Sequence, residues 1–357
     1  MTQDTGDPTD PVDEPPIGHL EIDDVKAKRD LKHGLVSLVV LVTMVVGLLL
    51  ALPGLHGVEQ KVVNMPFGWV LLALGLEVMS CVGYIVAFLQ VFERAPLRFG
   101  ARVALSELAF GAAVSLGGAG SIAVGAWLLI ERGGRPARIA ERSAVLFLLT
   151  SGVNLVVLAV AGLAAWTHLL PGSRNPLLSL LPGAVGVLAF LAFLALPQFA
   201  ERFCQGRTGR LAVWTLATAD TIRTTARLFF SFDWRLLGAY GFLLFDIAVL
   251  WVCFDALGHT PPVTAVILAY QIGYLSNFLP IPGGIGVLDG SFVGMFVLYG
   301  VNSTLAASAT LIYHAISLWV PAVWGTTAFI ALRRTRNQPL HWRHPRSELT
   351  REDIELP

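Results

Sequence analysis

Residues 269–296 read AYQIGYLSNFLPIPGGIGVLDGSFVGMF, and the interruption in the middle of this apolar stretch decides the fold. Pro280 and Pro282 cannot continue a helix that arrives from Tyr270, because proline lacks an amide donor and clashes with the preceding turn. The glycines that follow permit a tight reversal and a close approach of the backbone. A second helix is therefore expected to begin near Val287.

The composition of the whole chain places this stretch in a membrane. Of the 357 residues, 55% are hydrophobic and 14% are charged, which lies outside the usual range of soluble domains. Six apolar runs are each long enough for the roughly 20-residue helix that a bilayer core requires. The sequence therefore predicts an all-α membrane protein with six full crossings, which begin at Leu35, Phe67, Ala144, Leu177, Leu236 and near Thr304.

Two further apolar segments, 100–131 and 262–300, are each broken in the middle and predict re-entrant helical hairpins. In the first, the stretch from Val103 to Leu116 makes about 21 Å of helix, which is shorter than the roughly 30 Å of a bilayer core. Each segment is therefore expected to enter and leave on one side. Broken backbone is tolerated at membrane depth only inside the protein or along a watery cavity, so both breaks should face the interior.

The two breaks match each other at a shift of 166 residues. Three crossings lie between them, and an odd number places the two hairpins on opposite sides of the membrane. The predicted fold is thus an inverted repeat, whose halves can exchange inward-open and outward-open shapes around one site. The shift pairs Gly117, Gly118, Gly120 and Gly134 with Gly283, Gly284, Gly286 and Gly300.

The positions of the positive charges predict the orientation. With a cytoplasmic N-terminus, Lys61 and Arg174 alone lie outside, and the remaining 23 of the 25 Lys and Arg residues lie inside. Both termini are therefore expected on the inner side of the cytoplasmic membrane. Residues 1–34 predict a disordered tail, 35–332 the transmembrane domain, and 333–357 a basic tail suited to anionic inner-leaflet lipids.

Residues 207–230 predict a helix that lies along the inner membrane surface. Leu211, Trp214 and Ile222 fall roughly on one face, and most of the charged side chains fall elsewhere. This helix is either a plain connector or a gating element.

The quoted stretch, together with LIYHAISLWVPAVWG at 311–325, resembles the lysylphosphatidylglycerol synthase transmembrane region, a flippase-like family. The resemblance covers most of residues 35–332 and implies a lipid-translocating module whose re-entrant segments face a central cavity. Well-known members move aminoacylated phosphatidylglycerol and carry a soluble synthase domain, which this chain lacks, so it is not expected to be an enzyme. The implied site comprises Asn277, Pro280, Pro282, Gly283, Gly284, Gly286, Asp289, Tyr313 and His314.

This chain departs from the family pattern at two of these places. The family often has Arg-Glu-Gly after the glycine turn and Arg after the tyrosine of the last helix. Here the residues are Leu288, Asp289 and Gly290, and Tyr313 is followed by His314. The usual head group is therefore not carried over to this chain.

Helix starts near Ser121 and Val287 would point unpaired amide groups at the midplane from opposite sides, and such helix ends attract anions. The functional hypothesis is that a lipid phosphate passes between Gly117–Gly120 and Gly283–Gly286. In the alternative, these glycines only let the helices pack closely.

Acidic residues inside the apolar segments are a second set of candidates. Glu77 and Asp246 lie near the centres of crossings, where a charge costs about 2.5 to 3.5 kcal/mol. They either couple transport to a proton or cation or act as neutral carboxyls that tie helices together. Glu107 is a further candidate for such coupling. Asp289 either recognises a head group or caps its turn. His314 is either a titratable partner in the cavity or a satisfied core histidine.

Other chemistry is not indicated. The His and Cys residues show no metal-ligand spacing, so neither a metal nor another cofactor is expected. The basic stretches lack the interleaved aromatic residues of a nucleic-acid surface.

The predicted function is that of a lipid flippase or lipid-carrier transporter for a phospholipid, an aminoacylated lipid, a glycolipid or a polyprenyl phosphate. The alternative is a membrane subunit that supports a separate lipid-modifying enzyme without moving lipid. A homo-oligomer and a lipid-synthesising enzyme partner both stay open.

Overall fold

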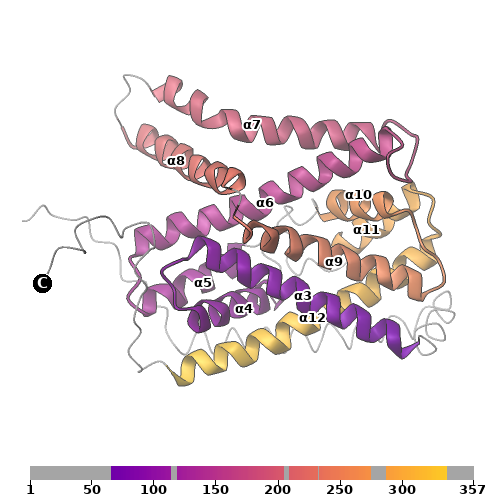
Figure 1. The fold of residues 1–357 in the computed structure, drawn as a ribbon, viewed down its shortest axis with the longest axis horizontal. Coiled ribbons are helices and arrows are strands. Elements are labelled where there is room, and N and C mark those ends of the chain that lie inside the picture. The colour runs from indigo at the N-terminus through magenta and orange to yellow at the C-terminus, as the bar shows by residue number, and fades with distance from the viewer. Residues whose placement is uncertain (1–65, 114–118, 205–208, 232, 275–286, 336–357) are drawn as a thin grey trace, which may run out of the picture.

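The computed structural model describes residues 66–113, 119–204, 209–231, 233–274 and 287–335. These residues fold into ten helices and contain no β-strand (Figure 1), which confirms the all-helical prediction for this part of the chain. The helices are α3 (Phe67–Val91), α4 (Leu97–Ala113), α5 (Ala119–Glu131), α6 (Pro136–Trp166), α7 (Leu180–Cys204), α8 (Arg210–Phe230), α9 (Leu236–Ala256), α10 (Val263–Tyr274), α11 (Val287–Leu298) and α12 (Ser303–Arg334).

Five of the described helices are long and apolar enough to cross a bilayer. α3, α6, α7, α9 and α12 contain 21 to 32 residues, and a crossing needs roughly 20. They correspond to five of the six predicted crossings. The run that begins at Leu35 lies outside the described residues. The chain is therefore a multi-pass membrane protein.

Two of the crossings are longer than the apolar runs that predicted them. α6 begins at Pro136 rather than near Ala144, because proline at the first helical position has a preset φ and loses no intrahelical hydrogen bond. α7 continues past Pro197 to Cys204. Both extensions carry arginines, so these helices leave the apolar core and end among polar groups.

α3 and α9 pack along each other through glycine. A side chain at Gly83 would collide with the backbone of Phe242 and Gly238, and one at Gly238 would meet Val86. Ser80 Oγ donates a 2.8 Å hydrogen bond to the Phe242 carbonyl across the same contact. Small residues let membrane helices approach closely, which is a main source of their packing energy.

The four short helices form two hairpins at opposite ends of the long axis (Figure 1). α4 packs against α5, and α10 packs against α11. The first hairpin lies at the end where α3 stops and α6 starts, and the second where α9 stops and α12 starts. These helices contain 12 to 17 residues, which makes each roughly 18 to 26 Å long, less than a bilayer core.

Each hairpin packs against a crossing from the other half of the chain. We call α3 to α6 the first unit and α9 to α12 the second unit. α4 of the first unit lies against α12, where a side chain at Gly325 would collide with the Leu105 carbonyl. α10 of the second unit lies against α6. The two units are therefore interlocked through their hairpins.

α7 lies outside the two units (Figure 1). It packs against α6 through small residues, since a side chain at Gly162 would collide with the backbone of Gly183. Elsewhere α7 exposes Leu181 (52%), Val185 (49%) and Leu188 (65%). This spacing gives the helix one continuous apolar face toward lipid.

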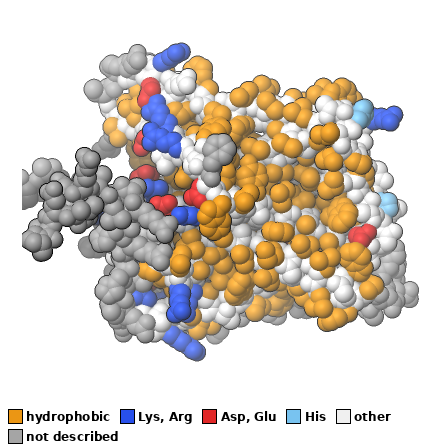
Figure 2. All heavy atoms as spheres, viewed as in Figure 1, with side chains coloured by type: hydrophobic (Ala, Val, Ile, Leu, Met, Phe, Trp, Pro, Cys, Tyr) orange, Lys and Arg blue, Asp and Glu red, His pale blue; other side chains and the backbone are white. Residues whose placement is uncertain are grey.

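Charged side chains gather at one end of the molecule, and an apolar surface covers most of the rest (Figure 2). The charged end is the end at which α8 and the first hairpin lie. Here Arg223 of α8 forms an ion pair with Glu201 of α7. Arg132 donates a 2.7 Å hydrogen bond to the Thr335 carbonyl, which joins the ends of α5 and α12.

Candidate functional site

The predicted site residues fall into three groups. Glu77, Glu107, Asp246, Tyr313 and His314 are described with their side chains. Gly120 and Asp289 lie in the first turns of α5 and α11, where the backbone alone is described. The remaining predicted residues lie outside the described residues: Gly117, Gly118, Asn277, Pro280, Pro282, Gly283, Gly284 and Gly286.

Glu77 and Asp246 meet where α3 and α9 pack together. Each residue lies near the middle of its helix, and Glu77 is 4% exposed. The two carboxyls are close enough to interact electrostatically and to form a hydrogen bond when one of them is protonated. Ionised carboxylates have acceptors only, so this bond needs a proton on one of the two. Two buried carboxylates this close would repel each other, so one proton held by the pair lowers the cost of its burial.

Two tyrosine hydroxyls bind Asp246. Tyr313 Oη of α12 donates a 2.9 Å hydrogen bond to Asp246 Oδ2, and Tyr270 Oη of α10 donates to the same oxygen. Both tyrosines are 4% exposed. Because a buried carboxylate without partners is costly, the two donors stabilise Asp246 in its charged form.

Phe292 of α11 packs the second hairpin against Tyr313 and His314 of α12. Its buried ring lies 5.5 Å from the Tyr270 ring, 6.1 Å from Tyr313 and 5.8 Å from His314, measured between centroids. Such aromatic pairs contribute about 0.5 to 1.5 kcal/mol each beyond their buried area. His314 is half-buried and interacts electrostatically with Asp246.

We call Glu77, Asp246, Tyr270, Tyr313 and His314 the carboxyl cluster. Its side chains come from α3 of the first unit and from α9, α10 and α12 of the second unit. The cluster therefore spans the boundary between the two units.

Glu107 forms a second buried carboxyl site, in the first hairpin. It is 3% exposed, and the Tyr84 hydroxyl of α3 donates a hydrogen bond to it. Its carboxyl also lies against Gly125 of α5, where a side chain would collide with the Glu107 carboxyl. Glu107 thus fills the space between the two limbs of this hairpin.

The second hairpin has a similar contact, but here the glycine lies on the first helix and the large side chain on the second. A side chain at Gly273 of α10 would collide with the ring of Phe292 of α11. At the 166-residue shift, Glu107 corresponds to Gly273, and Gly125 corresponds to residue 291, next to Phe292. The two helices of each hairpin therefore pack together at equivalent positions, through a carboxyl in the first hairpin and an aromatic ring in the second.

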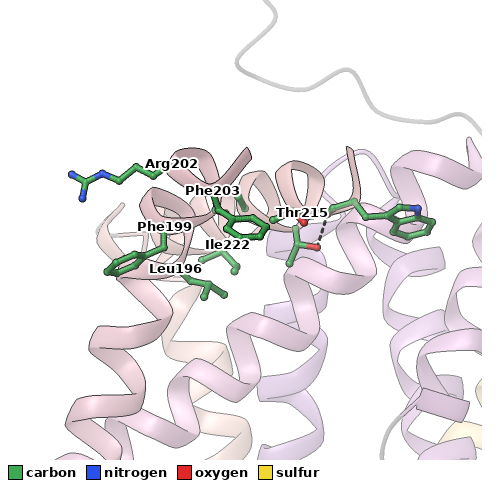
Figure 3. A pocket seen from close by; sticks show the side chains of 10 residues that line it. Leu196, Phe199, Arg202, Phe203, Thr215 and Ile222 are labelled. Carbon is green, nitrogen blue, oxygen red and sulfur yellow. Dashed lines mark hydrogen bonds between the residues drawn. The ribbon is translucent and has the colours of Figure 1, made fainter. Parts of the chain in front are cut away.

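A groove between α7 and α8 has a volume of about 780 Å³ (Figure 3). Leu196, Phe199, Phe203 and Ile222 line it, and the Arg202 side chain points away from it. The hydroxyls of Thr215 and Thr218 donate to carbonyls of their own helix. The groove therefore lacks the convergent polar groups of a specific ligand site.

Tyr84 and Tyr270 were not predicted from the sequence, although each holds a predicted carboxyl. The usable signal was a tyrosine inside an apolar segment, because a buried hydroxyl needs a partner. Among the described residues, no group of His, Cys, Asp and Glu is arranged to hold a metal ion. The described cysteines, Cys81, Cys204 and Cys253, are buried and free.

Comparison with known proteins identifies sequence relatives. The profile of the lysylphosphatidylglycerol synthase transmembrane region matches residues 34–325. A 91-residue stretch, 25% of the chain, is 34% identical to a UPF0104 membrane protein of Methanothermobacter thermautotrophicus. A 92-residue stretch, 26% of the chain, is 32% identical to a UPF0104 membrane protein of Methanocaldococcus jannaschii. These matches span about a quarter of each relative, 26% and 27% of their lengths.

Proposed function

The chain belongs to the family of the lysylphosphatidylglycerol synthase transmembrane region, and from this premise we propose that it moves a lipid between the leaflets of the cytoplasmic membrane. Its substrate class is a phospholipid, an aminoacylated lipid, a glycolipid or a polyprenyl-phosphate carrier. In this proposal the chain acts as a transporter and not as an enzyme.

The observation that carries the proposal is the pair of short helical hairpins at opposite ends of the molecule (Figure 1). We take each hairpin to enter and leave the membrane on its own side, because its helices are shorter than a bilayer core. Each one packs against a crossing of the other unit. A movement of one unit would therefore shift both hairpins, as alternating access requires.

The lipid phosphate is proposed to pass near the starts of α5 and α11. These helices begin at Ala119 and Val287, directly after the two breaks. The first amide groups of a helix have no intrahelical acceptor, and they attract anions together with the helix dipole. Two such starts, one from each unit, form a path for a phosphate that needs no arginine.

Reconstitution tests the proposal. Purified protein is placed in liposomes that contain a fluorescent phospholipid, aminoacylated lipid, glycolipid or polyprenyl phosphate, and an impermeant quencher reports the outer-leaflet fraction over time. Faster equilibration of one class than in protein-free liposomes supports transport. Equilibration at the protein-free rate for every class contradicts transport and favours the non-transporting subunit.

Glycine variants test the path. Gly118→Trp and Gly284→Trp place a bulky side chain at each break, and both are expected to reduce the translocation rate at least about tenfold if the break lines the path. Gly75→Trp on α3 is the control, because a side chain there meets nothing within 4 Å. Translocation at the wild-type rate in both test variants would contradict the proposed path.

A further inference from the structure

We propose that the carboxyl cluster is a proton-binding site in which Glu77 and Asp246 share one proton and gain a second, and that this second proton drives lipid movement. The coupling rests on the proposed function, whereas the proton binding stands on the cluster itself. Glu77 and Asp246 come from different units, so a proton bound between them lies where the two units meet.

The hydrogen-bond pattern assigns the resident proton. Asp246 Oδ2 already accepts from the hydroxyls of Tyr270 and Tyr313, and these donors favour a negative charge. Glu77 is 4% exposed, and its Oε2 atom has no hydrogen-bond partner among the described residues. An ionised Glu77 would leave that oxygen charged and unpartnered, which is costly away from water. Glu77 therefore carries the proton and donates the hydrogen bond to Asp246.

Further titratable groups near the pair come from α3, α10 and α12. α3 contributes Cys81 beside Glu77, α10 contributes Tyr274 beside Tyr270, and α12 contributes His314. Of the two carboxyls, Asp246 is the one whose negative charge is stabilised by tyrosine hydroxyls. The next proton goes to Asp246 and converts a carboxylic acid and a carboxylate into two carboxylic acids.

Protonation of Asp246 acts on the second hairpin through Tyr270. A hydrogen bond to a carboxylate is roughly twice as strong as one to a neutral acid, so the Tyr270 and Tyr313 bonds weaken when Asp246 becomes neutral. Tyr270 belongs to α10, and Tyr313 belongs to α12. The second proton therefore loosens α10 and α12 from the α3–α9 contact.

Infrared spectroscopy tests the proton site without any transport. Purified protein in lipid nanodiscs is titrated, and the absorption of protonated carboxyls is followed. Glu77→Gln is expected to remove one protonated carboxyl at neutral pH, and Asp246→Asn to remove the one that appears on acidification. Tyr313→Phe should change the acid range in which the Asp246 signal appears. Spectra that Glu77→Gln leaves unchanged would overturn the site.

Liposomes with a pH difference test the coupling. A tenfold proton gradient is equivalent to about 1.4 kcal/mol, so one proton per lipid sustains a leaflet ratio of up to about ten. Wild type and Asp220→Asn, a change on the exposed face of α8, should build up such a ratio. Glu77→Gln and Asp246→Asn should give none.

The outcomes separate the two claims. Wild-type equilibration that is fast but leaves equal leaflets under a pH gradient overturns the coupling and leaves transport standing. A leaflet ratio that follows an imposed sodium gradient instead overturns the choice of the proton. If no lipid class equilibrates, the proposed function and the coupling fall together, whereas the infrared result still decides the proton site.

Discussion

At the scale of single residues, Asp246 is the most heavily constrained group of the carboxyl cluster. Two buried hydroxyls and one carboxyl converge on it from three other helices. Because each donor comes from a different helix, its side chain ties α3, α10 and α12 to α9. Stability and function should therefore both respond to changes at this residue.

Removing one of its donors gives a residue-scale prediction. Tyr313→Phe leaves the packing of the ring intact but removes the 2.9 Å hydrogen bond to Asp246. We expect a loss of about 1 to 2 kcal/mol in stability, within the range for buried hydrogen bonds in membrane proteins. Thermal unfolding of the purified protein in detergent measures this loss.

Tyr240→Phe on α9 is the matched control, because no described hydrogen bond uses the hydroxyl of this half-buried residue. It should unfold like the wild type. If both variants lose the same stability, the Asp246 bond is not the cause of the loss.

The depth of Glu77 and Asp246 could be predicted from the sequence, but their contact could not. An apolar run shows how far along a helix a carboxyl lies. The side of the helix that faces a neighbour is normally indicated by apolar periodicity, and that signal is weak when protein and lipid are both apolar. Tyr84 and Tyr270 could not be predicted for the same reason, because only the structure shows which carboxyls they bind.

At the scale of helices, glycine decides which pairs pack closely. Gly83 sits in the α3–α9 contact with backbone on the other side, whereas Gly75, two turns earlier, faces open space. The two positions therefore allow a comparison within one helix.

Gly83→Leu should separate α3 from α9 and with them the carboxyl cluster, because backbone cannot move aside as a flexible side chain does. Overpacking costs about 1 to 3 kcal/mol, and here we expect the upper end. Unfolding in detergent and the infrared signal of Glu77 should both change. Gly75→Leu should leave both unchanged, and a loss of similar size in that variant would contradict the packing argument.

The contact between the limbs of the second hairpin can be tested in the same way. Gly273→Leu would collide with the fully buried ring of Phe292. We expect a loss of about 1 to 3 kcal/mol, seen as a lower unfolding temperature in detergent. Gly294→Leu on α11 is the control, because a side chain there meets nothing within 4 Å. Equal losses in both variants would show that the hairpin does not depend on this contact.

The helices on either side of each break and a helix close to 207–230 were predictable, because proline and glycine mark breaks by local chemistry. The packing of each hairpin on the opposite unit was not, because it depends on contacts such as that between Gly325 and Leu105, far apart in the sequence.

At the scale of the whole molecule, the charge distribution defines the orientation to be tested. The predicted orientation places the charged end in Figure 2 in the cytoplasm. Single cysteines, introduced after the three native cysteines are replaced, are probed in intact cells with an impermeant thiol reagent. Arg174→Cys should react from outside, and Arg138→Cys at the start of α6 should react only after the cells are opened. The reverse pattern would contradict the orientation.

α7 contributes no side chain to the carboxyl cluster, and yet the architecture depends on it. Each unit contains two crossings, so the chain leaves a unit at the same end of the molecule at which it entered. α7 is the one described crossing between the units, and it carries the chain back across the molecule so that α9 starts where α3 stopped. Without α7, the second unit would have the same orientation as the first, and both hairpins would lie at the same end of the molecule. A peripheral helix thus sets the parity of the fold, because its single pass turns the second unit antiparallel to the first.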